Sequence, residues 1–492
     1  MIALLIAALG MAAIGGAVAL LLNGRGPRVQ PNVFVNPAGA IDANNSPTVA
    51  RNPVDPANVV VVNRIDRPLF SAGLHSSVDG GTTWETIPLP LPPGKDRPFA
   101  PDAAFGPGGT LFVSYVNLAG PGNAPENLWL ARSRDGGRSL SEPVRIAAEG
   151  TFQARMAVGP DGILHVTWLE PSEVAPLAFP GPTRVVAVRS EDEGATWTEP
   201  VPVSDPDRER VGAASPVVDA EGRIFVLYQD FKDDVRDFSG DPDGPAWQGT
   251  FGLVLSRSDD GGRTFAPGVE LESGIVPTER FLPFLPEFPS LAVDLTGTLY
   301  VIWASGHNGD RDVFMRHSVD GGLTWSEPVR VNDNPVGDGT DQYLPRVSVA
   351  ASGRVDVVFY DRRRDPTNVM TDAFLAMSED GGRSFENLRV SAASFDSRVG
   401  STAAPFLPVD FGSRLGLDST ERGALAAWTD TRLGDEATGR QDIVASHVAI
   451  SSGLASGPFL LGIATLLVIA ALGSLLFFLR SRATRRSAAK VA

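Results

Sequence analysis

The chain has 492 residues, contains no cysteine and carries a net charge of −16 at pH 7. The absence of cysteine excludes disulfides, thiol catalysis and cysteine-type zinc sites. The excess of acidic side chains argues against binding to nucleic acid, because the phosphates would be repelled. The length allows two or three ordinary domains or one large repeat domain.

The N-terminal segment, residues 1–22, is apolar, has no charged side chain and is long enough to span a bilayer. Ala17-Val18-Ala19 is similar to a signal-peptide cleavage site, but three leucines follow it. We therefore expect an uncleaved anchor, with a cleaved signal as the alternative. Residues 23–45 are rich in Pro, Gly and Asn, which indicates a linker, except for a short predicted strand at Val33–Val35.

Residues 46–447 repeat one pattern of four short strands, with an eight-residue turn motif between the third strand and the fourth. The motif reads Ser-x-Asp-x-Gly-x-Thr/Ser, followed by an aromatic residue in five copies and by Leu140 in one. The copies are Ser77–Trp84, Ser133–Leu140, Ser190–Trp197, Ser258–Phe265, Ser318–Trp325 and Ser378–Phe385. The steps between them are 56, 57, 68, 60 and 60 residues. A repeat of this kind is typical of a β-propeller.

After the repeats, residues 457–479 form a second apolar segment long enough to cross a bilayer. Residues 480–492 follow it and carry five basic side chains and no acidic one. Basic flanks mark the cytoplasmic side of a membrane span. The sequence therefore predicts a cytoplasmic tail at 480–492 and an extracytoplasmic repeat region tethered to the cell membrane.

Each motif predicts a tight turn, in which the glycines adopt backbone angles closed to other residues and the Asp carboxylate accepts backbone N–H groups. The motif resembles the Asp-box, or BNR repeat, of the sialidase-type β-propellers. This resemblance implies an all-β propeller with the boxes on the outer rim, away from the active site. It gives a structural role to Asp79, Asp135, Asp192, Asp260, Asp320 and Asp380.

The number of blades is predicted from the strongly apolar second strand of each repeat, which occurs seven times. These strands are Val59–Val62, Leu111–Tyr115, Leu164–Trp168, Ile224–Tyr228, Leu299–Trp303, Val355–Phe359 and Leu425–Trp428. The seventh repeat has no turn motif, and the N-terminal strand is expected to complete it and close the ring. We predict a seven-bladed propeller flanked by transmembrane helices, with the six blades of sialidases as the alternative.

Charged residues follow the second strands, as in Asp361-Arg362-Arg363 and Asp430-Thr431-Arg432. At the mouth of a propeller such residues suit carboxylate recognition and acid–base catalysis. The alternative is that these Asp-x-Arg pairs cap strand ends and tie blades together. The resemblance implies a Tyr–Glu nucleophilic pair, an acid and a set of arginines. The residues assigned to these roles are Tyr360, Asp361 and Glu287 for catalysis, and Arg155, Arg346, Arg363, Arg432 and Trp247 for substrate binding. The early Arg-Ile-Pro motif of sialidases is absent, and Arg64-Ile65-Asp66 on a predicted strand is the nearest string.

The resemblance implies a glycan as partner, and its first enzymatic prediction is an exo-α-sialidase-type glycoside hydrolase. The alternative is a non-catalytic propeller that binds a glycan or an envelope protein as an adhesion or scaffold module. No cofactor is expected, although the acidic loop at 231–249 makes Ca²⁺ a weaker alternative. Trp247 in that loop is of the type that stacks on a sugar ring or packs in a core.

Overall fold

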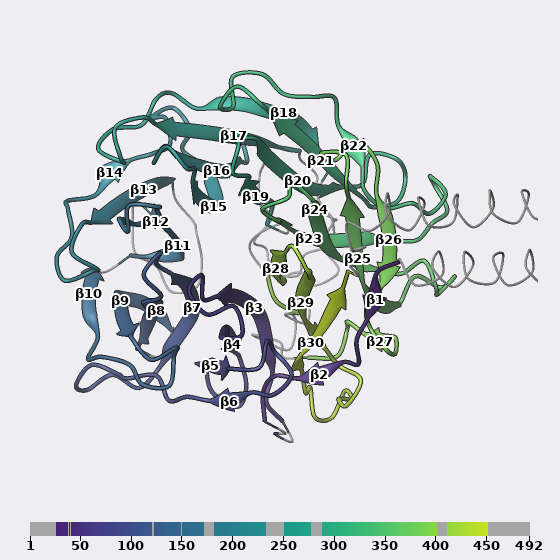
Figure 1. Ribbon diagram of the computed structural model, residues 1–492, viewed down its shortest axis with the longest axis horizontal. Coiled ribbons are helices and arrows are strands. Elements are labelled where there is room, and N and C mark those ends of the chain that lie inside the picture. Colours follow the sequence, from purple (N-terminus) through teal and green to yellow (C-terminus); the bar gives the residue numbers. More distant parts are fainter. Residues whose placement is uncertain are drawn as a thin grey trace, which may run out of the picture. The chain divides into compact units, whose positions relative to one another are not determined.

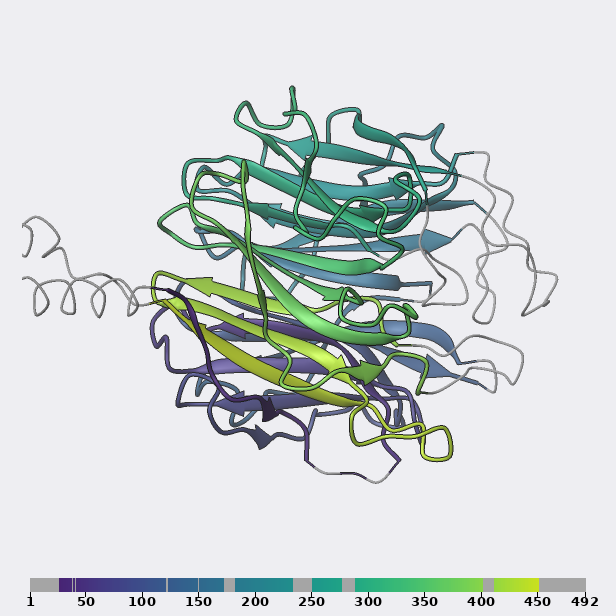
Figure 2. The same ribbon diagram turned by 90° about the vertical axis from the view of Figure 1, so that its right-hand side faces the viewer.

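The computed structural model describes residues 26–37, 39, 41–120, 123–148, 150–171, 182–232, 250–276, 288–400 and 411–450. Val29–Val448 forms one compact unit, in which seven antiparallel sheets are arranged as a ring (Figures 1 and 2). The described residues form strands and turns, and none of them belongs to a helix able to cross a membrane. The two predicted membrane segments, 1–22 and 457–479, lie outside the described residues.

Six sheets are built from strands that follow one another in the chain. Blade one is β3 (Asn44–Arg51), β4 (Val59–Ile65), β5 (Ser71–Ser77) and β6 (Glu85–Thr86), and blade two is β7 (Pro98–Phe105), β8 (Leu111–Ala119), β9 (Ala124–Ser133) and β10 (Val144–Ala147). Blade three is β11 (Phe152–Val158), β12 (Leu164–Pro171), β13 (Thr183–Ser190) and β14 (Val201–Pro202), and blade four is β15 (Val211–Val218), β16 (Ile224–Asp230), β17 (Phe251–Ser258) and β18 (Val269–Ile275). Blade five is β19 (Ser290–Val293), β20 (Leu299–Ser305), β21 (Asp312–Ser318) and β22 (Val329–Arg330), and blade six is β23 (Gln342–Val349), β24 (Val355–Asp361), β25 (Met370–Ser378) and β26 (Glu386–Arg389), with β27 (Phe395–Asp396) beside β25.

The seventh blade joins the two ends of the ring. Its first three strands are β28 (Gly416–Thr420), β29 (Gly423–Asp430) and β30 (Asp442–Ala449). β30 also pairs with β1 (Arg28–Val29) and β2 (Val33–Phe34) from the N-terminal side. Val33 lies opposite Ala445 in an antiparallel register, and β1 and β2 are seen beside β30 in Figure 1. The ring therefore has seven blades, which confirms the seven-bladed prediction and excludes the six-bladed alternative.

The hydrophobic core lies between neighbouring blades. The second strand of each blade is buried along nearly its whole length, because each of its two faces packs on an adjacent sheet. One cluster joins Phe112 of blade two to Val166 of blade three, and another joins Val61 of blade one to Leu425 of blade seven. This is why the second strands are continuous apolar runs in the sequence rather than alternating ones.

The six repeated turns are closed by hydrogen bonds within the motif. In the copy at Ser318, the Ser318 hydroxyl donates to Asp320 Oδ1 (2.8 Å) and accepts from the Gly322 N–H (2.9 Å). The Thr324 N–H donates to Asp320 Oδ1 (2.9 Å) and its hydroxyl donates to Oδ2 (2.6 Å). Gly322 has a φ of 86°, and a Cβ there would lie 2.4 Å from Leu255 of blade four. Each such turn thus packs closely on the preceding blade, which explains its glycine.

The turn carboxylates make the ring sensitive to acid. Hydrogen bonds from the hydroxyl and N–H of Thr324 lower the pKa of Asp320 from 3.8 to about 2, and Asp192 is lowered to about 2 by the same bonds from Thr196. A lowered folded-state pKa gives stability that is present above the unfolded pKa and is lost as the pH falls toward 2. We expect the melting temperature, measured by circular dichroism, to fall between pH 4 and pH 2. In the Asp320→Asn variant this fall should be less steep than in the unsubstituted protein, because one titrating carboxylate is removed. An equal acid dependence in Asp320→Asn would contradict this.

Candidate functional site: an arginine cluster in the channel

The inner strands of five blades share one irregularity. In β3, β7, β11, β15 and β23, a residue with positive φ, such as Gln153 (52°) or Leu344 (53°), accompanies a shift of register against the second strand. A bulge of this kind re-aims the side chains beside it. The residues two positions after the positive φ are Thr48, Asp102, Arg155, Ser215 and Arg346.

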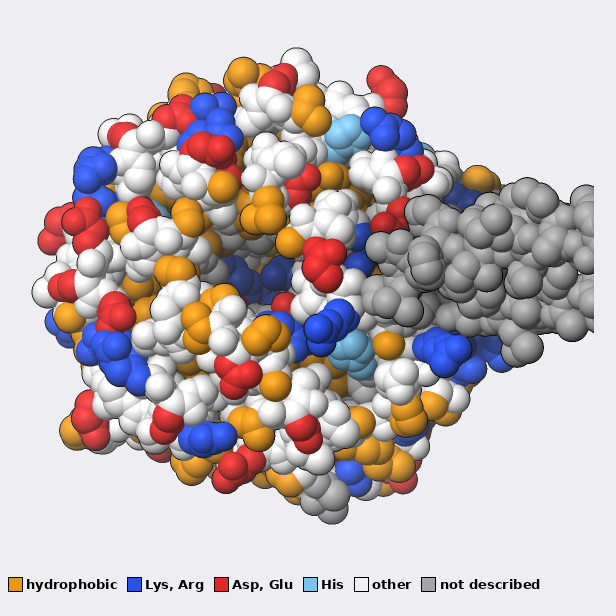
Figure 3. Space-filling model, in the orientation of Figure 1, with side chains coloured by type: hydrophobic (Ala, Val, Ile, Leu, Met, Phe, Trp, Pro, Cys, Tyr) orange, Lys and Arg blue, Asp and Glu red, His pale blue; other side chains and the backbone are white. Residues whose placement is uncertain are grey.

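Four arginines and one aspartate meet across the ring. Electrostatic interactions connect Arg155 of blade three with Arg346 of blade six, Arg64 of blade one and Asp102 of blade two. They connect Arg414, which precedes β28 of blade seven, with the same four residues. Blades three and six are not neighbours, so their side chains meet in the central channel. Figure 3, viewed as Figure 1, shows a central hollow with Lys or Arg side chains inside it. We call these five residues the channel cluster.

Two of the arginines are held firmly by the ring. Arg414 Nε donates to Thr48 Oγ1 (2.9 Å), and its Nη2 donates to the carbonyl oxygen of Pro101 (2.5 Å). Arg64 Nη2 donates to Asp66 Oδ2 (2.6 Å). Both arginines are buried, with 8% of Arg414 and 7% of Arg64 exposed. They form a fixed wall of the channel.

The other two arginines have fewer protein partners and are partly accessible. Arg155 Nη1 donates to the carbonyl oxygen of Ala154 (2.9 Å), and its guanidinium lies 5.8 Å from the centre of the Phe288 ring. Among the described residues, the Arg346 guanidinium forms no hydrogen bond and no ion pair. It interacts electrostatically with Asp102 over a longer distance. Arg155 and Arg346 therefore keep donors available to a ligand.

Among the described residues, the channel cluster and Asp66, the ion-pair partner of Arg64, carry an excess of positive charge. The four guanidiniums face the carboxylates of Asp102 and Asp66, which leaves 4 − 2 = +2. Burial lowers the pKa of Arg155, Arg346 and Arg414, and repulsion from the other arginines adds to this for Arg155 and Arg414. Interactions between charges are stronger in such a buried place than in water. The channel is therefore suited to a ligand that carries negative charge.

Tyr360, predicted as the nucleophile, lies away from this cluster. It is fully buried in β24, and its hydroxyl donates to the Thr429 carbonyl oxygen and accepts from the Thr429 N–H, each at 3.0 Å. Its ring packs on Tyr343 and Phe411, and burial raises its pKa well above the ordinary value. The prediction needs correction, because this hydroxyl ties blade six to blade seven and is closed to a substrate.

All five tyrosines of the sequence are described, and none brings its hydroxyl to the channel cluster. The Tyr115 hydroxyl donates to Pro90 O, Tyr300 to Asp294 Oδ2 (3.2 Å), and Tyr343 bonds Thr371 (2.8 Å), while Tyr228 is fully buried in blade four. The predicted Glu287 and Trp247, and residues 233–249 of the acidic loop, lie outside the described residues. No tyrosine of the described residues therefore offers its hydroxyl beside the channel arginines.

Asp361, Arg363 and Arg432, also predicted as site residues, form ion pairs at strand ends. Arg363 Nε donates to Asp361 Oδ2 (2.7 Å), and Arg432 Nε donates to Asp430 Oδ1 (2.9 Å). Both aspartates are fully buried, and burial raises the pKa of Asp361. The Asp-x-Arg pairs thus act as ties at strand ends, as in the alternative interpretation of the sequence.

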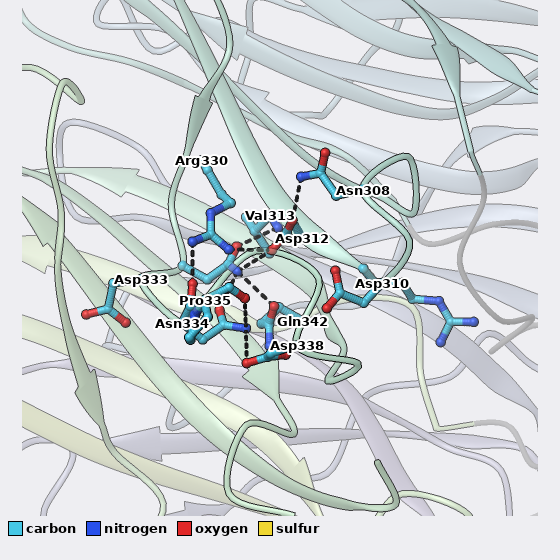
Figure 4. Close-up of polar contacts among 12 residues, drawn as sticks. Asn308, Asp310, Asp312, Val313, Arg330, Asp333, Asn334, Pro335, Asp338 and Gln342 are labelled. Atoms are coloured by element: carbon cyan, nitrogen blue, oxygen red, sulfur yellow. Dashed lines mark hydrogen bonds and ion pairs between the residues drawn. The ribbon is translucent and has the colours of Figure 1, made fainter. Parts of the chain in front are cut away.

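The segment Asp310–Asp312 belongs to the same kind of network (Figure 4). Asp312 is fully buried and accepts from Arg330 (2.9 Å), Asn332 (2.6 Å) and Asn308 (2.7 Å). Its oxygens are therefore occupied by protein donors. Within the described ranges, no group of three or more His, Asp or Glu side chains is placed to hold a metal ion.

Of the predicted binding residues, the ring brings Arg155 and Arg346 together, although 191 positions separate them (346 − 155). Asp102 and Arg414 were not predicted, and Arg64 was noted in the string Arg64-Ile65-Asp66 without being assigned to the site. Asp102 could have been found, since it occupies the same place in its inner strand as Arg155 and Arg346. In blade seven, the position equivalent to Arg155 and Arg346 is Gly416 of β28. Arg414 lies before that strand, so aligning the inner strands of the blades does not find it.

No protein-family model matches the chain, and no curated protein matches it in sequence. Among solved structures, the chain is similar to an ulvan lyase, a polysaccharide lyase, with a TM-score of 0.51, 11% identity, 86% of this chain covered and 96% of that one. A second structure of that lyase, bound to -[GlcA(1-4)Rha3S]-, gives a TM-score of 0.50, 12% identity and coverage of 85% and 96%. A Hadza microbial sialidase gives a TM-score of 0.44 and 13% identity, with 82% and 75% covered. The chain thus shares its propeller fold with the ulvan lyase.

Proposed function

We propose that the protein is a membrane-tethered, extracytoplasmic propeller that binds an acidic glycan in its central channel. The observation that carries this proposal is the channel cluster, in which four guanidiniums face the carboxylate of Asp102, with Asp66 paired to Arg64 beside them. A guanidinium donates paired hydrogen bonds that match the oxygens of a carboxylate or sulfate. An acidic sugar would supply the negative charge that the channel lacks.

This proposal keeps one part of the sialidase-type prediction, the binding of a sugar carboxylate by arginines. It does not include the other part, the attack of a tyrosine nucleophile on the sugar. The arginines supply donors for a sugar carboxylate, but the tyrosine hydroxyls that a nucleophile would need lie between or within the blades. We therefore prefer glycan binding, the second of the two predicted functions, to exo-α-sialidase activity. The tether rests on the apolar segments 1–22 and 457–479, and the side of the membrane rests on the basic tail at 480–492.

The test uses the full-length chain, purified in detergent, with sialyllactose, an oligoglucuronate and the methyl ester of each. We expect the acids to bind and to raise the melting temperature, because a ligand that binds the folded state stabilises it. We expect the uncharged esters to bind more weakly. Calorimetry measures both, and mass spectrometry of the sugars reports cleavage. Equal binding of acid and ester would contradict the proposal, and release of sialic acid would restore the hydrolase prediction.

A further inference from the structure

The chain enters and leaves the ring at one face. The third strands of blades one to six, β5, β9, β13, β17, β21 and β25, each end at the serine that begins a repeated turn. We call the face that carries these six turns the turn face. β30 is the third strand of blade seven, so its end at Ala449 occupies the place of a turn. The Gln30 N–H donates to His447 O (2.8 Å), and Val35 N–H donates to Ile443 O (2.8 Å), so the N-terminal strand begins at the same face.

Only short stretches separate these ends from the two apolar segments. Residues 23–27 precede β1 on one side, and residues 450–456 follow β30 on the other. Fully extended, five and seven residues reach at most ~18 Å and ~25 Å. A strand of eight residues spans ~26 Å, so either stretch would be used up in running along a blade to the opposite face. Because both connections are short and start from the same face, the ring has little freedom to direct its opposite face toward the membrane.

We infer that the turn face lies against the lipid bilayer and that the opposite mouth of the channel faces away from it. This inference rests on the proposed tether and is independent of the proposed anion site. Arg64, near the end of β4, and Arg414, before the start of β28, lie toward the mouth opposite the turns. The channel arginines are therefore reached from the side away from the membrane.

The turn face has a surface compatible with lipid headgroups. Val319 and Leu323, in one turn, are 76% and 66% exposed. Leu295, in the loop between β19 and β20 at the same face, is 69% exposed. Arg263 and Arg383 are exposed in two other turns and offer cations to phosphate groups. Exposed apolar side chains also occur at the opposite face, so exposure alone does not decide the orientation. The positions of the strand ends decide it.

The opposite face offers matched controls. Leu69 follows β4 and is 74% exposed, Val336 precedes β23 and is 63% exposed, and Leu433 follows β29 and is 52% exposed. Their side chains are similar in size and exposure to Val319 and Leu323. Because the chain has no cysteine, a single cysteine at any of these positions is the only labelling site.

The experiment labels Val319→Cys, Leu323→Cys, Leu69→Cys and Val336→Cys in the full-length chain with an environment-sensitive fluorophore. Each variant is reconstituted into phosphatidylcholine vesicles with and without a headgroup-attached spin label, which quenches nearby fluorophores. We expect a several-fold larger loss of fluorescence at Val319 and Leu323 than at the two controls. Melting temperatures equal to that of the unsubstituted chain verify that each variant is folded.

Two outcomes would overturn the inference, and they are distinguishable. If the protein does not float with the vesicles in a density gradient, the proposed tether fails and the orientation fails with it. If the protein floats but quenching is equal at both faces or larger at Leu69 and Val336, the tether stands and the orientation is wrong. Acidic-sugar binding, measured separately in detergent, tests the anion site and is unaffected by either result.

Discussion

Replacing Arg346 by methionine is expected to weaken binding of an acidic sugar about 10- to 100-fold while leaving the ring as stable as before or more stable. A hydrogen bond to a charged group contributes about 1.5–3 kcal/mol, which corresponds to this range of dissociation constants. The Arg346 charge is disfavoured by burial, as its lowered pKa records, and its electrostatic partner is Asp102. Methionine keeps the apolar length of the side chain and removes the charge.

Calorimetric titration and thermal unfolding of the full-length variant measure the two effects. Arg263→Met is the matched control, because it removes the same charge from an exposed turn and should leave both binding and stability unchanged. A stability loss in Arg346→Met equal to the loss of binding energy would show that this arginine supports the fold. Unchanged affinity would place the ligand elsewhere.

Asp356→Ala is expected to have the largest effect on stability. Arg354 and Asp356 are 3% and 0% exposed and form a bidentate pair of 2.9 and 2.8 Å. Arg354 Nη2 also donates to Thr420 O (2.9 Å) and Gly423 O (3.3 Å), so the pair ties blade six to blade seven. Removing one partner leaves a buried, uncompensated charge, which costs about 3–5 kcal/mol. A lower denaturation midpoint in guanidinium chloride checks this.

The double variant Arg354→Met/Asp356→Ala separates the cost of the orphaned charge from the loss of packing. Since the buried cation is removed together with its partner, we expect the double variant to recover a large part of the stability. If the double variant is less stable than Asp356→Ala, then the hydrogen bonds to the blade-seven carbonyls matter more than the charge. An unchanged midpoint in the single variant would mean that water reaches Arg354.

The number of blades followed from local features of the chain. Seven apolar second strands and six turn motifs are patterns of a few residues each, and hydrogen bonding and burial act on such patterns wherever they occur. Because there are seven apolar second strands but only six turn motifs, the sequence also indicated that Val33–Val35 is the strand that completes the last blade. Pairing of Val33 with Ala445 places that strand in blade seven.

The site depended on the ring. In the sequence, a substrate carboxylate could be bound equally well by Asp361-Arg362-Arg363 or by the isolated Arg155. In the structure, Arg363 pairs with Asp361, whereas Arg155 lies with the other arginines in the central channel. Local sequence cannot separate these cases, because an arginine beside an aspartate pairs within its own blade or reaches across the channel according to the strand that carries it.

The sequence by itself determined the repeat, the all-β class, the seven blades and the apolar segments at both ends, since each follows from short-range pattern and composition. Only the tertiary structure decided which charges meet. Arg64 and Arg414 are 350 positions apart (414 − 64), and closure of the ring brings them to one channel. It also set both ends of the ring at the turn face, because that position follows from the direction of β30 and its pairing with the N-terminal strands.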